Sequence, residues 1–349
     1  MYVDIRSVDV IAPNFKKRLS GVTSTIIQLV PYQRQAGLAI AALGPGLPES
    51  VPKIRFRDLW RLWIRPRSGK MRVWHARRNV EMLPGIIMRD VLRMPVKLVF
   101  TSASQRNHSA YTKLLIRQMD HVIATSAKTA SYLTVSHTVI MHGIDTAKFF
   151  PADTIELAKQ NVGLPPDKFV AGCFGRIRRQ KGTDLFVDAM IAVLPDQPHW
   201  IAIIAGRTTT EHVVFENQLR SRIRDAGLQD RILFVGEHSQ IAKWYQALDL
   251  YIAPQRWEGF GLTPLEAMAT GVAVIATDAG AFRELVAEGL TGNIVAPNDL
   301  SQLIKAVTNL MKSPELITSY GHNGLERART LFPLHTEVAA LDAVYRSLM

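Results

Sequence analysis

Short apolar stretches alternate along the chain with longer stretches whose apolar residues recur every three or four positions. The first pattern predicts buried strands and the second amphipathic helices, so we expect βαβ units with parallel sheets. In the first half the predicted strands are 4–12, 38–43, 97–101, 121–125 and 138–141. In the second half they are 169–174, 200–205, 231–235, 249–253, 272–277 and 293–295. The pattern therefore predicts an α/β protein.

Helical periodicity fills the segments between these strands. The predicted helices are 23–35, 183–194, 212–226, 240–247, 263–270, 281–287 and 299–312, with one more beyond about 333. A stretch at 148–167, rich in proline and polar residues, separates the halves, as is typical of a domain boundary. We therefore predict an N-terminal domain at 1–150, a C-terminal domain at 151–332 and a final helix at 333–349. Two open parallel sheets joined by a hinge imply a cleft between the domains.

Composition narrows the class of protein. The 349 residues suffice for two domains, and 47% hydrophobic with 21% charged residues is typical of a globular chain. The single cysteine, Cys173, excludes a disulfide framework and lies in an apolar strand, which favours a core position and a reducing, cytosolic compartment. No apolar run approaches the ~18 residues of a membrane span, and the first residues lack a signal-peptide pattern.

The net charge of +12 is concentrated in one segment. Residues 51–100 contain 13 lysines and arginines against three acidic residues, and Trp60, Trp63 and Trp74 are interleaved with them. Basic residues among tryptophans suit an anionic membrane surface or a phosphorylated lipid acceptor. A solvated basic face with tryptophan in the core is the simpler alternative. Nucleic acid is a weaker one, because no nucleic-acid-binding motif is present.

The segment 257–271 carries the most specific chemistry. Glu258 lies in a glycine-bearing loop after a buried strand, and Glu266 lies in the first turn of the following helix. Thr263, Pro264 and Glu266 also match the N-cap, N1 and N3 positions of a capping box, which would make Glu266 structural. Capping explains neither Glu258 nor the Gly-Phe-Gly run between them, whereas two carboxylates at a sheet edge suit the hydroxyls of a nucleotide sugar.

This segment resembles the Glu-x7-Glu motif of retaining nucleotide-sugar glycosyltransferases of the family 4 type, also called glycosyl transferases group 1. The resemblance implies that Glu258 lies near the transferred sugar and that Glu266 binds the ribose. It also implies substrate contacts from Gly259, Phe260, Gly261 and Leu262.

A basic loop after the strand 169–174 contains Arg176 and Lys181, which can converge on a diphosphate. It matches neither the phosphate-binding loop of nucleoside triphosphatases nor the glycine fingerprint of nicotinamide enzymes. It resembles the Gly-Arg-x4-Lys-Gly diphosphate site of the same transferase family. The resemblance implies that Arg176 and Lys181 neutralise the charge of the departing nucleoside diphosphate.

Other parts of the resemblance are less complete. The segment 140–151 resembles the Asn-Gly-Val-Asp…Phe-x-Pro segment of the family's domain junction, with His142 in place of asparagine. The pair Ser20-Gly21 stands where the family often has two glycines, so Gly21 is expected to approach the donor. His108 is a candidate for binding acceptor or sugar, or an ordinary histidine at a helix start. No residue set has metal-ligand spacing, and we expect neither a metal nor a cofactor.

The resemblance implies a GT-B fold, in which two Rossmann-like parallel-sheet domains face each other across a cleft. The first would bind the acceptor and the second the sugar nucleotide, with retention of anomeric configuration. The basic segment 51–100 and the stretch 100–106 further resemble lipopolysaccharide core mannosyltransferases of Gram-negative bacteria. That implies GDP-mannose as donor, an anionic glycolipid acceptor bearing Kdo, and a cytoplasmic protein peripherally associated with the inner membrane.

Three alternatives stay open at this point. The nearest is a UDP-sugar-dependent transferase acting on another glycolipid or polysaccharide. A nucleotide-sugar epimerase on the same scaffold would need further catalytic acids. A basic membrane- or nucleic-acid-binding protein without catalysis would respond to no nucleoside diphosphate.

Overall fold

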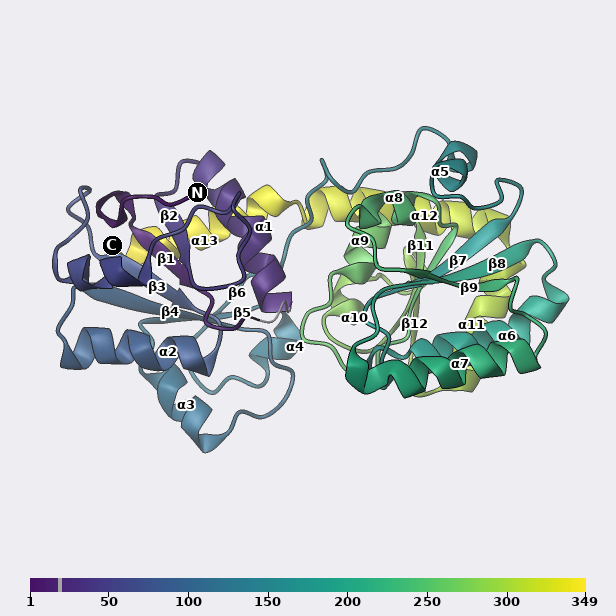
Figure 1. The fold of residues 1–349 in the computed structure, drawn as a ribbon, viewed down its shortest axis with the longest axis horizontal. Helices are drawn as coiled ribbons and strands as arrows, with labels where there is room; N and C mark the ends of the chain where they lie inside the picture. The colour runs from purple at the N-terminus through teal and green to yellow at the C-terminus, as the bar shows by residue number, and fades with distance from the viewer. Residues whose placement is uncertain (18–20) are drawn as a thin grey trace. The chain divides into compact units, whose positions relative to one another are not determined.

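The computed structural model describes residues 1–17 and 21–349 and divides into two compact units. The first comprises Met1–Met141 and Leu334–Met349, and the second His142–Pro333. Each contains a parallel sheet of six strands with helices on both faces (Figure 1). The predicted α/β class and the two Rossmann-like domains are therefore confirmed.

The sheet of the first unit has the order β2-β1-β3-β4-β5-β6. Its strands are β1 (Val10–Pro13), β2 (Ile40–Leu43), β3 (Arg72–Ala76), β4 (Val96–Ser102), β5 (His121–Ala124) and β6 (Thr138–Val139). Its helices are α1 (Gly21–Gln35), α2 (Asn79–Ile86), α3 (Ala110–Arg117), α4 (Ala127–Ala130) and α13 (Leu334–Leu348), with the shorter η1 (Ile5–Ser7), η2 (Phe56–Trp63) and η3 (Ile87–Val91). The strand order reverses between β1 and β3, and open α/β sheets bind ligands at the carboxyl ends of such strands.

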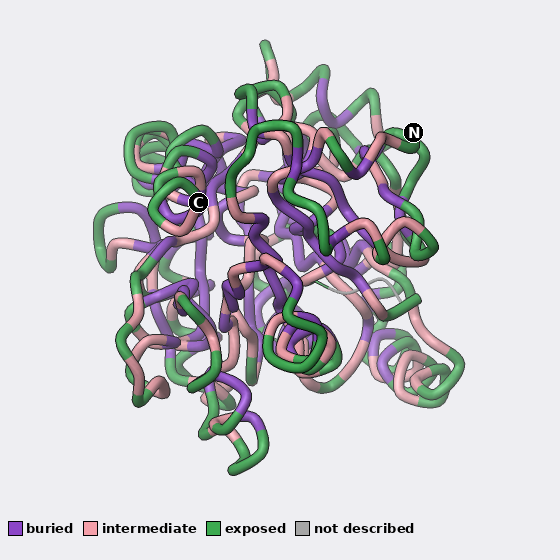
Figure 2. The backbone as a smooth tube through the Cα atoms, turned by 90° about the vertical axis from the view of Figure 1, so that its left-hand side faces the viewer, coloured by how far each residue is buried: buried purple, intermediate pink, exposed green. Residues whose placement is uncertain are grey.

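Alternate residues of each strand face opposite sides of this sheet. Val10 and Ala12 belong to a core with α1 and α13, whereas Ile11 belongs to a second core with Trp74 and Met82. Strands β1, β2 and β3 are buried at every position, the edge strand β6 is exposed, and the helices carry both buried and exposed positions (Figure 2). Burial on both faces explains why these strands have runs of apolar residues instead of an alternating pattern.

Two expectations for this sheet are wrong. The strand predicted at 4–12 begins only at Val10, because η1 occupies Ile5–Ser7 and the Asp4 side chain caps it by accepting from Arg6 N at 3.0 Å. The strand β3 was not expected within the basic segment.

The strand β3 was not predicted because it starts with an arginine, a residue type that is usually exposed, and this arginine is buried. Arg72 is 1% exposed and donates to the carbonyl oxygens of Val8 at 3.0 Å and Ile64 at 2.6 Å. Burial lowers the pKa of its guanidinium. Trp74 in the same strand is equally buried, so neither residue belongs to a membrane-facing surface.

The sheet of the second unit has the order β12-β11-β10-β7-β8-β9. Its strands are β7 (Phe169–Phe174), β8 (Trp200–Ala205), β9 (Ile232–Gly236), β10 (Leu250–Ala253), β11 (Ala273–Thr277) and β12 (Gly292–Val295). Its helices are α5 (Ile155–Asn161), α6 (Thr183–Val193), α7 (Val213–Asp225), α8 (Ile241–Gln246), α9 (Thr263–Ala269), α10 (Phe282–Leu285), α11 (Leu300–Met311) and α12 (Pro314–Leu331), with the single turns η4 (Arg179–Lys181), η5 (Leu194–Asp196) and η6 (Thr210–His212). All six predicted strands are confirmed, and α12 is an additional helix.

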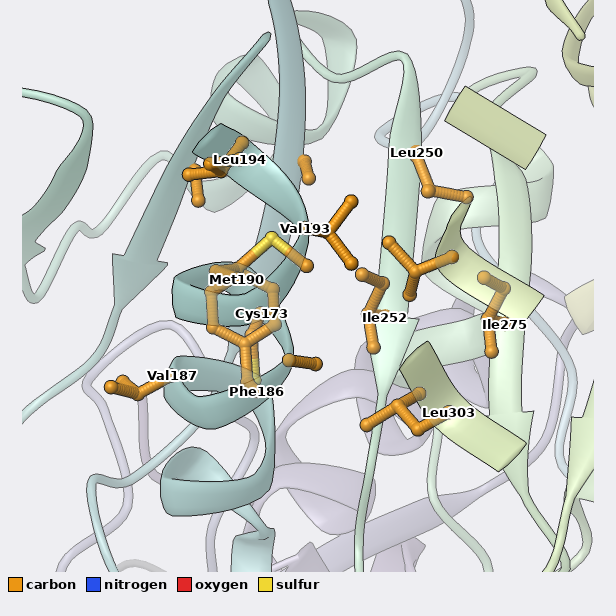
Figure 3. Packing of buried hydrophobic residues seen from close by; sticks show 14 of the residues in the cluster. Cys173, Phe186, Val187, Met190, Val193, Leu194, Leu250, Ile252, Ile275 and Leu303 are labelled. Atoms are coloured by element: carbon orange, nitrogen blue, oxygen red, sulfur yellow. The ribbon is translucent and has the colours of Figure 1, made fainter. Parts of the chain in front are cut away.

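The core of the second unit lies between its sheet and α6, α7 and α11. Phe186 and Met190 of α6 pack over Cys173 of β7, beside Ile252 and Leu303 (Figure 3). Burial raises the pKa of the Cys173 thiol to about 12. The thiol is therefore a protonated core group and not a nucleophile, as its apolar context predicts.

The boundary between the units differs from the one expected at residue 150. The first unit ends at Met141, and residues 142–150 belong to the second. His142 packs edge-on against Phe260 with ring centroids 4.8 Å apart, which anchors this segment in the second unit. The helix α13 belongs to the first unit.

A buried histidine joins α13 to the sheet of the first unit. His75 Nδ1 lies 2.7 Å from the Tyr345 hydroxyl, and its Nε2 lies 2.7 Å from Thr101 Oγ1. Burial and nearby cations hold the pKa of His75 well below its usual value, so the folded state keeps this ring neutral.

We expect this histidine to make stability depend on pH. In the unfolded chain His75 takes up a proton below about pH 6.5, so the unfolded state binds more protons and stability falls as pH drops through that value. The Tm of wild type should therefore drop more between pH 7 and pH 5 than that of His75→Gln, as measured by circular dichroism. His322→Gln, at an exposed site, should behave as wild type. An equal drop in all three proteins would rule out His75 as the cause.

Candidate active site

The basic loop, residues 175–182, connects β7 to α6. It carries Arg176 and Lys181, which the sequence predicts to bind a diphosphate. Gly182 has a φ of +71°, and a β-carbon there would lie 1.9 Å from the carbonyl oxygen of Pro254. Only glycine permits this close approach, so the basic loop is held against the segment that follows β10.

The acidic loop, residues 254–262, connects β10 to α9 and carries Glu258. Lys181 Nζ donates to Glu258 Oε2 and forms an ion pair with it. Gly259 N donates to the other carboxylate oxygen at 3.2 Å. The Lys181 and Glu258 side chains are 18% and 19% exposed, so the pair is shielded yet still accessible to a ligand. The structure thus brings together two predicted residues that are 77 positions apart.

The remaining residues of the acidic loop have mixed roles. Phe260 is 5% exposed and its ring packs against His142, so its side chain anchors the loop and is not placed to contact a substrate. Gly261 has a φ of +87°, and a β-carbon there would lie 2.2 Å from the Phe282 ring. The part of 259–262 that remains available to a ligand is mainly backbone, and the substrate contacts expected of these residues stay predictions.

Glu266 does not form the expected capping box. The helix α9 begins at Thr263, its N-cap residue is Leu262, and no side chain caps it. Pro264 is therefore the second helical residue and not the first. Glu266 Oε2 accepts a hydrogen bond from the Tyr245 hydroxyl at 2.8 Å instead. The structural interpretation of Glu266 as a capping residue is wrong.

Electrostatics favour a ligand-directed role for Glu266. Burial raises the pKa of its carboxyl, while the hydrogen bond from Tyr245 and the charges of Lys148 and Lys181 lower it. Burial and the neighbouring Glu266 raise the pKa of Tyr245 well above its usual value, so this hydroxyl stays a donor. Tyr245 thereby orients one carboxylate oxygen and leaves the other for a ligand.

A pocket of about 200 Å³ lies at the carboxyl ends of β7, β8 and β9. Its lining includes Arg176, Glu237, His238, Tyr245, Thr263 and Glu266. Arg176 forms no hydrogen bond or ion pair with any residue that the structure describes, so its guanidinium is available to an anion. The pocket therefore offers a cation and a carboxylate to one ligand.

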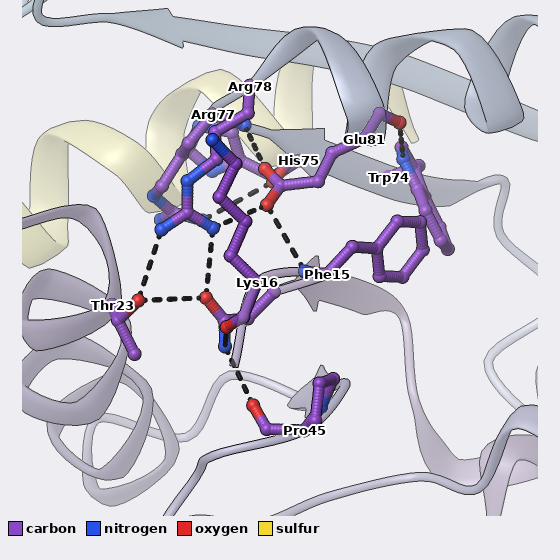
Figure 4. Close-up of polar contacts among 10 residues, drawn as sticks. Phe15, Lys16, Thr23, Pro45, Trp74, His75, Arg77, Arg78 and Glu81 are labelled. Atoms are coloured by element: carbon purple, nitrogen blue, oxygen red, sulfur yellow. Dashed lines mark hydrogen bonds and ion pairs between the residues drawn. The ribbon is translucent and has the colours of Figure 1, made fainter. Parts of the chain in front are cut away.

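A buried polar network occupies the switch point of the first unit, where β1 and β3 end (Figure 4). Arg78 Nη1 donates to Asn14 Oδ1 at 2.9 Å and to Glu81 Oε1 at 2.8 Å, and its Nη2 donates to Thr23 Oγ1 at 3.0 Å. The Glu81 side chain is fully buried. The network holds Asn14, just after β1, and Thr23 in the first turn of α1 in place.

Gly21 is the first residue of α1, next to this network. A β-carbon at Gly21 would meet nothing within 4 Å, so the described structure does not itself require glycine there. Ser20, the other member of the pair, lies outside the described residues. The expected approach of Gly21 to the donor stays a prediction.

His108 precedes α3 in the first unit and is half-buried. Its Nε2 lies 3.4 Å from Ser102 Oγ. Burial lowers the pKa of His108, and the cations Arg106 and Lys113 lower it further. The neighbouring cations suit an anionic acceptor, and the role of His108 stays a prediction.

Three contributors were missed by sequence reasoning. Tyr245 orients Glu266, and Arg256 with Asp184 ties the basic and acidic loops together. Tyr245 has no recognisable motif around it. The sequence signal for Arg256 was its position, two residues before Glu258.

Among residues 1–17 and 21–349, no group of three or more His, Cys, Asp or Glu side chains is placed to hold a metal ion. No described helix is long and apolar enough to cross a membrane.

Comparison with known proteins agrees with this geometry. The family model described as "Glycosyl transferases group 1" matches residues 154–327. The lipopolysaccharide core biosynthesis mannosyltransferase LpsB of Rhizobium meliloti is 61% identical over 99% of both chains. LpcC of Rhizobium leguminosarum bv. viciae, which has the same description, is 54% identical over 99% of this chain and 98% of its own length.

Solved structures give the same fold. Anabaena Alr3699/HepE, crystallised with UDP, has a TM-score of 0.84 at 19% identity and covers 98% of this chain and 100% of its own. The C-terminal domain of LpcC from Francisella tularensis is 35% identical, with a TM-score of 0.53, over 55% of this chain and all of that one. With two Rossmann-like units of the GT-B type and relatives that match its whole length, the chain belongs to the group 1 glycosyltransferases.

Proposed function

We propose that this protein transfers mannose from GDP-mannose to an anionic glycolipid acceptor during synthesis of the lipopolysaccharide core, with retention of anomeric configuration. The observation that carries the proposal is the convergence of Arg176, Lys181, Glu258 and Glu266 at one sheet edge of the second unit. The relatives described as lipopolysaccharide core mannosyltransferases support the sugar and the pathway.

In the proposed mechanism Arg176 and Lys181 neutralise the charge that develops on the departing diphosphate. Glu258 accepts hydrogen bonds from hydroxyls of the transferred sugar, and Glu266, oriented by Tyr245, accepts from the ribose. The anomeric carbon acquires oxocarbenium character while the bond to the phosphate oxygen breaks. The acceptor oxygen attacks from the same face, and its proton passes to the leaving phosphate. The helix α9 has only seven residues, so side chains supply most of the stabilisation.

The residues at the rim of the pocket favour guanine as the base of the donor nucleotide. Glu237 and His238 lie there beside Arg207, whose Nε is 3.7 Å from Glu237 Oε2. Guanine presents two neighbouring donors, N1–H and the 2-amino group, which one carboxylate can accept together. Uracil presents a single N–H between two carbonyl oxygens, and these oxygens are repelled by a nearby carboxylate. UDP-sugars remain the alternative donors, since the Anabaena structure contains UDP.

The basic segment supports binding to an anionic membrane surface, but through fewer residues than the sequence suggests. Trp60 and Trp63 of η2 are 59% and 51% exposed, whereas Trp74 is buried. Trp63 Nε1 donates to the carbonyl oxygen of Leu92 at 2.8 Å, which places exposed Leu92 beside η2. We propose that this surface binds the cytoplasmic face of the inner membrane, where the lipid acceptor lies.

We expect Trp60→Ala with Trp63→Ala to weaken membrane binding at least tenfold, because two exposed indoles lose their interfacial contacts. The measurement is co-sedimentation with vesicles of phosphatidylglycerol and phosphatidylcholine. Val214→Ala with Leu331→Ala removes two exposed apolar side chains elsewhere and should leave binding unchanged. Unchanged binding by the tryptophan variant would reject this surface.

The proposed reaction is tested with a panel of labelled sugar nucleotides and extracted lipid A precursors. GDP-mannose should give a mannosylated lipid with the α configuration of the donor, read by NMR, and GDP should raise the Tm more than UDP. Transfer from UDP-glucose instead would favour the alternative donor. A protein that no nucleoside diphosphate stabilises would contradict the proposal as a whole.

A further inference from the structure

Arg256 belongs to the acidic loop, and its side chain bonds to residues of the basic loop and of α6. Its Nη1 and Nη2 donate to Asp184 Oδ1 and Oδ2 at 2.6 and 2.9 Å, a bidentate pair. Nη1 also donates to the carbonyl oxygen of Arg179 at 2.5 Å. The Arg256 and Asp184 side chains are 19% and 12% exposed, so solvent screens this pair less than a surface pair.

The backbones of the two loops interlock at the same place. Arg256 N donates to the carbonyl oxygen of Gln180 at 3.0 Å, and Gln180 Nε2 donates to that of Trp257 at 3.3 Å. Gln180 immediately precedes Lys181, and Trp257 immediately precedes Glu258. Any shift of one loop against the other therefore moves Lys181 relative to Glu258.

A third segment joins the same guanidinium. Arg256 Nε donates at 2.5 Å to Oδ1 of Asn298, which follows β12. Asn298 has a φ of +65°, a conformation uncommon for residues other than glycine. Four of the five N–H donors of Arg256 are thus engaged within the protein. Arg256 does not line the described pocket, and it has little capacity left to bind a ligand itself.

We propose that Arg256 and Asp184 are positioning residues that hold Lys181 and Glu258 at the separation required for transfer. The inference rests on the roles proposed above for Lys181 and Glu258. A bidentate guanidinium–carboxylate pair fixes direction as well as distance, which a lysine cannot reproduce. Since misplacement of catalytic groups by about 1 Å can cost about a hundredfold in rate, small movements of these loops matter.

The test is a double-mutant cycle with Arg256→Lys and Lys181→Ala. Arg256→Lys should lower kcat tenfold to a hundredfold in the wild-type background but less than threefold when Lys181 is already absent. Arg346→Lys makes the same change at the exposed pair with Asp342 in α13 and should alter kcat less than twofold. Equal losses from Arg256→Lys in both backgrounds would show a general structural role and overturn the proposal.

A crystal structure of Arg256→Lys gives a second readout. The contact between Lys181 and Glu258 should be lost, and its retention would overturn the proposal. Asp184→Asn takes the place of Arg256→Lys if that variant does not fold. The cycle uses whichever sugar nucleotide the wild-type enzyme accepts. A wrong donor assignment would appear as wild-type inactivity with GDP-mannose and would leave the test of Arg256 intact.

Discussion

Replacing Lys181 with alanine should lower kcat/KM for transfer by about 30- to 1000-fold, equivalent to about 2–4 kcal/mol of transition-state stabilisation. The ammonium lies in the basic loop, close to Glu258 and 18% exposed, where a charge acts in a partly desolvated environment. Arg176 remains in the variant and retains part of the diphosphate binding. The variant should also bind GDP more weakly, because free GDP carries the full negative charge of the departed diphosphate.

Steady-state kinetics and calorimetric GDP titration measure these two effects separately. Lys312→Ala removes an exposed lysine at the end of α11 and serves as the control. Full turnover by Lys181→Ala would exclude Lys181 from the mechanism. Unchanged GDP affinity would show that Lys181 does not contact the diphosphate.

Replacing Glu258 with glutamine should have opposite effects on catalysis and on nucleotide binding. Transfer should fall by about 30- to 150-fold, because a charged acceptor for the sugar hydroxyls is lost, at about 2–3 kcal/mol. GDP should bind about fivefold more tightly, because Lys181 no longer has to leave its ion pair with Glu258 before it meets the diphosphate. A partly exposed pair of this kind is worth about 1 kcal/mol.

The measurements are again transfer kinetics and GDP titration. Glu326→Gln, at an exposed position of α12, changes charge by the same amount and should leave both quantities unchanged. Weaker GDP binding by Glu258→Gln would contradict the idea that the carboxylate competes with the diphosphate for Lys181.

The strands of the second unit were predictable to within one residue at each end, because each is an apolar run and all but the edge strand β9 are buried along most of their length. The strand β3 was not, because Arg72 and His75 supply polar side chains whose partners lie elsewhere in the chain. A buried arginine bonded to carbonyl oxygens looks like a surface residue in the sequence. The burial of Trp74 was likewise not predictable, because Trp74 and the exposed Trp60 lie in the same basic segment of the sequence.

The candidate active site shows the same division. Local context and the family resemblance selected Arg176, Lys181, Glu258 and Glu266, each of which lies in a loop or first turn at the carboxyl end of a strand. Whether Glu266 caps α9 required the structure, because its three-residue spacing from Thr263 also matches a capping box. In the structure Glu266 accepts a hydrogen bond from the hydroxyl of Tyr245, which lies 21 positions earlier in the chain.

Short-range information along the chain determined the α/β class, the strands of the second unit and the loops that carry charged residues. These features depend on periodicity and turn chemistry within about ten residues, and the sequence displays both directly. Only the tertiary structure decided which charges pair, which basic residues are buried and where α13 packs. Those outcomes depend largely on contacts between residues far apart in the chain, such as Arg256 with Asp184 and His75 with Tyr345, which no local pattern specifies.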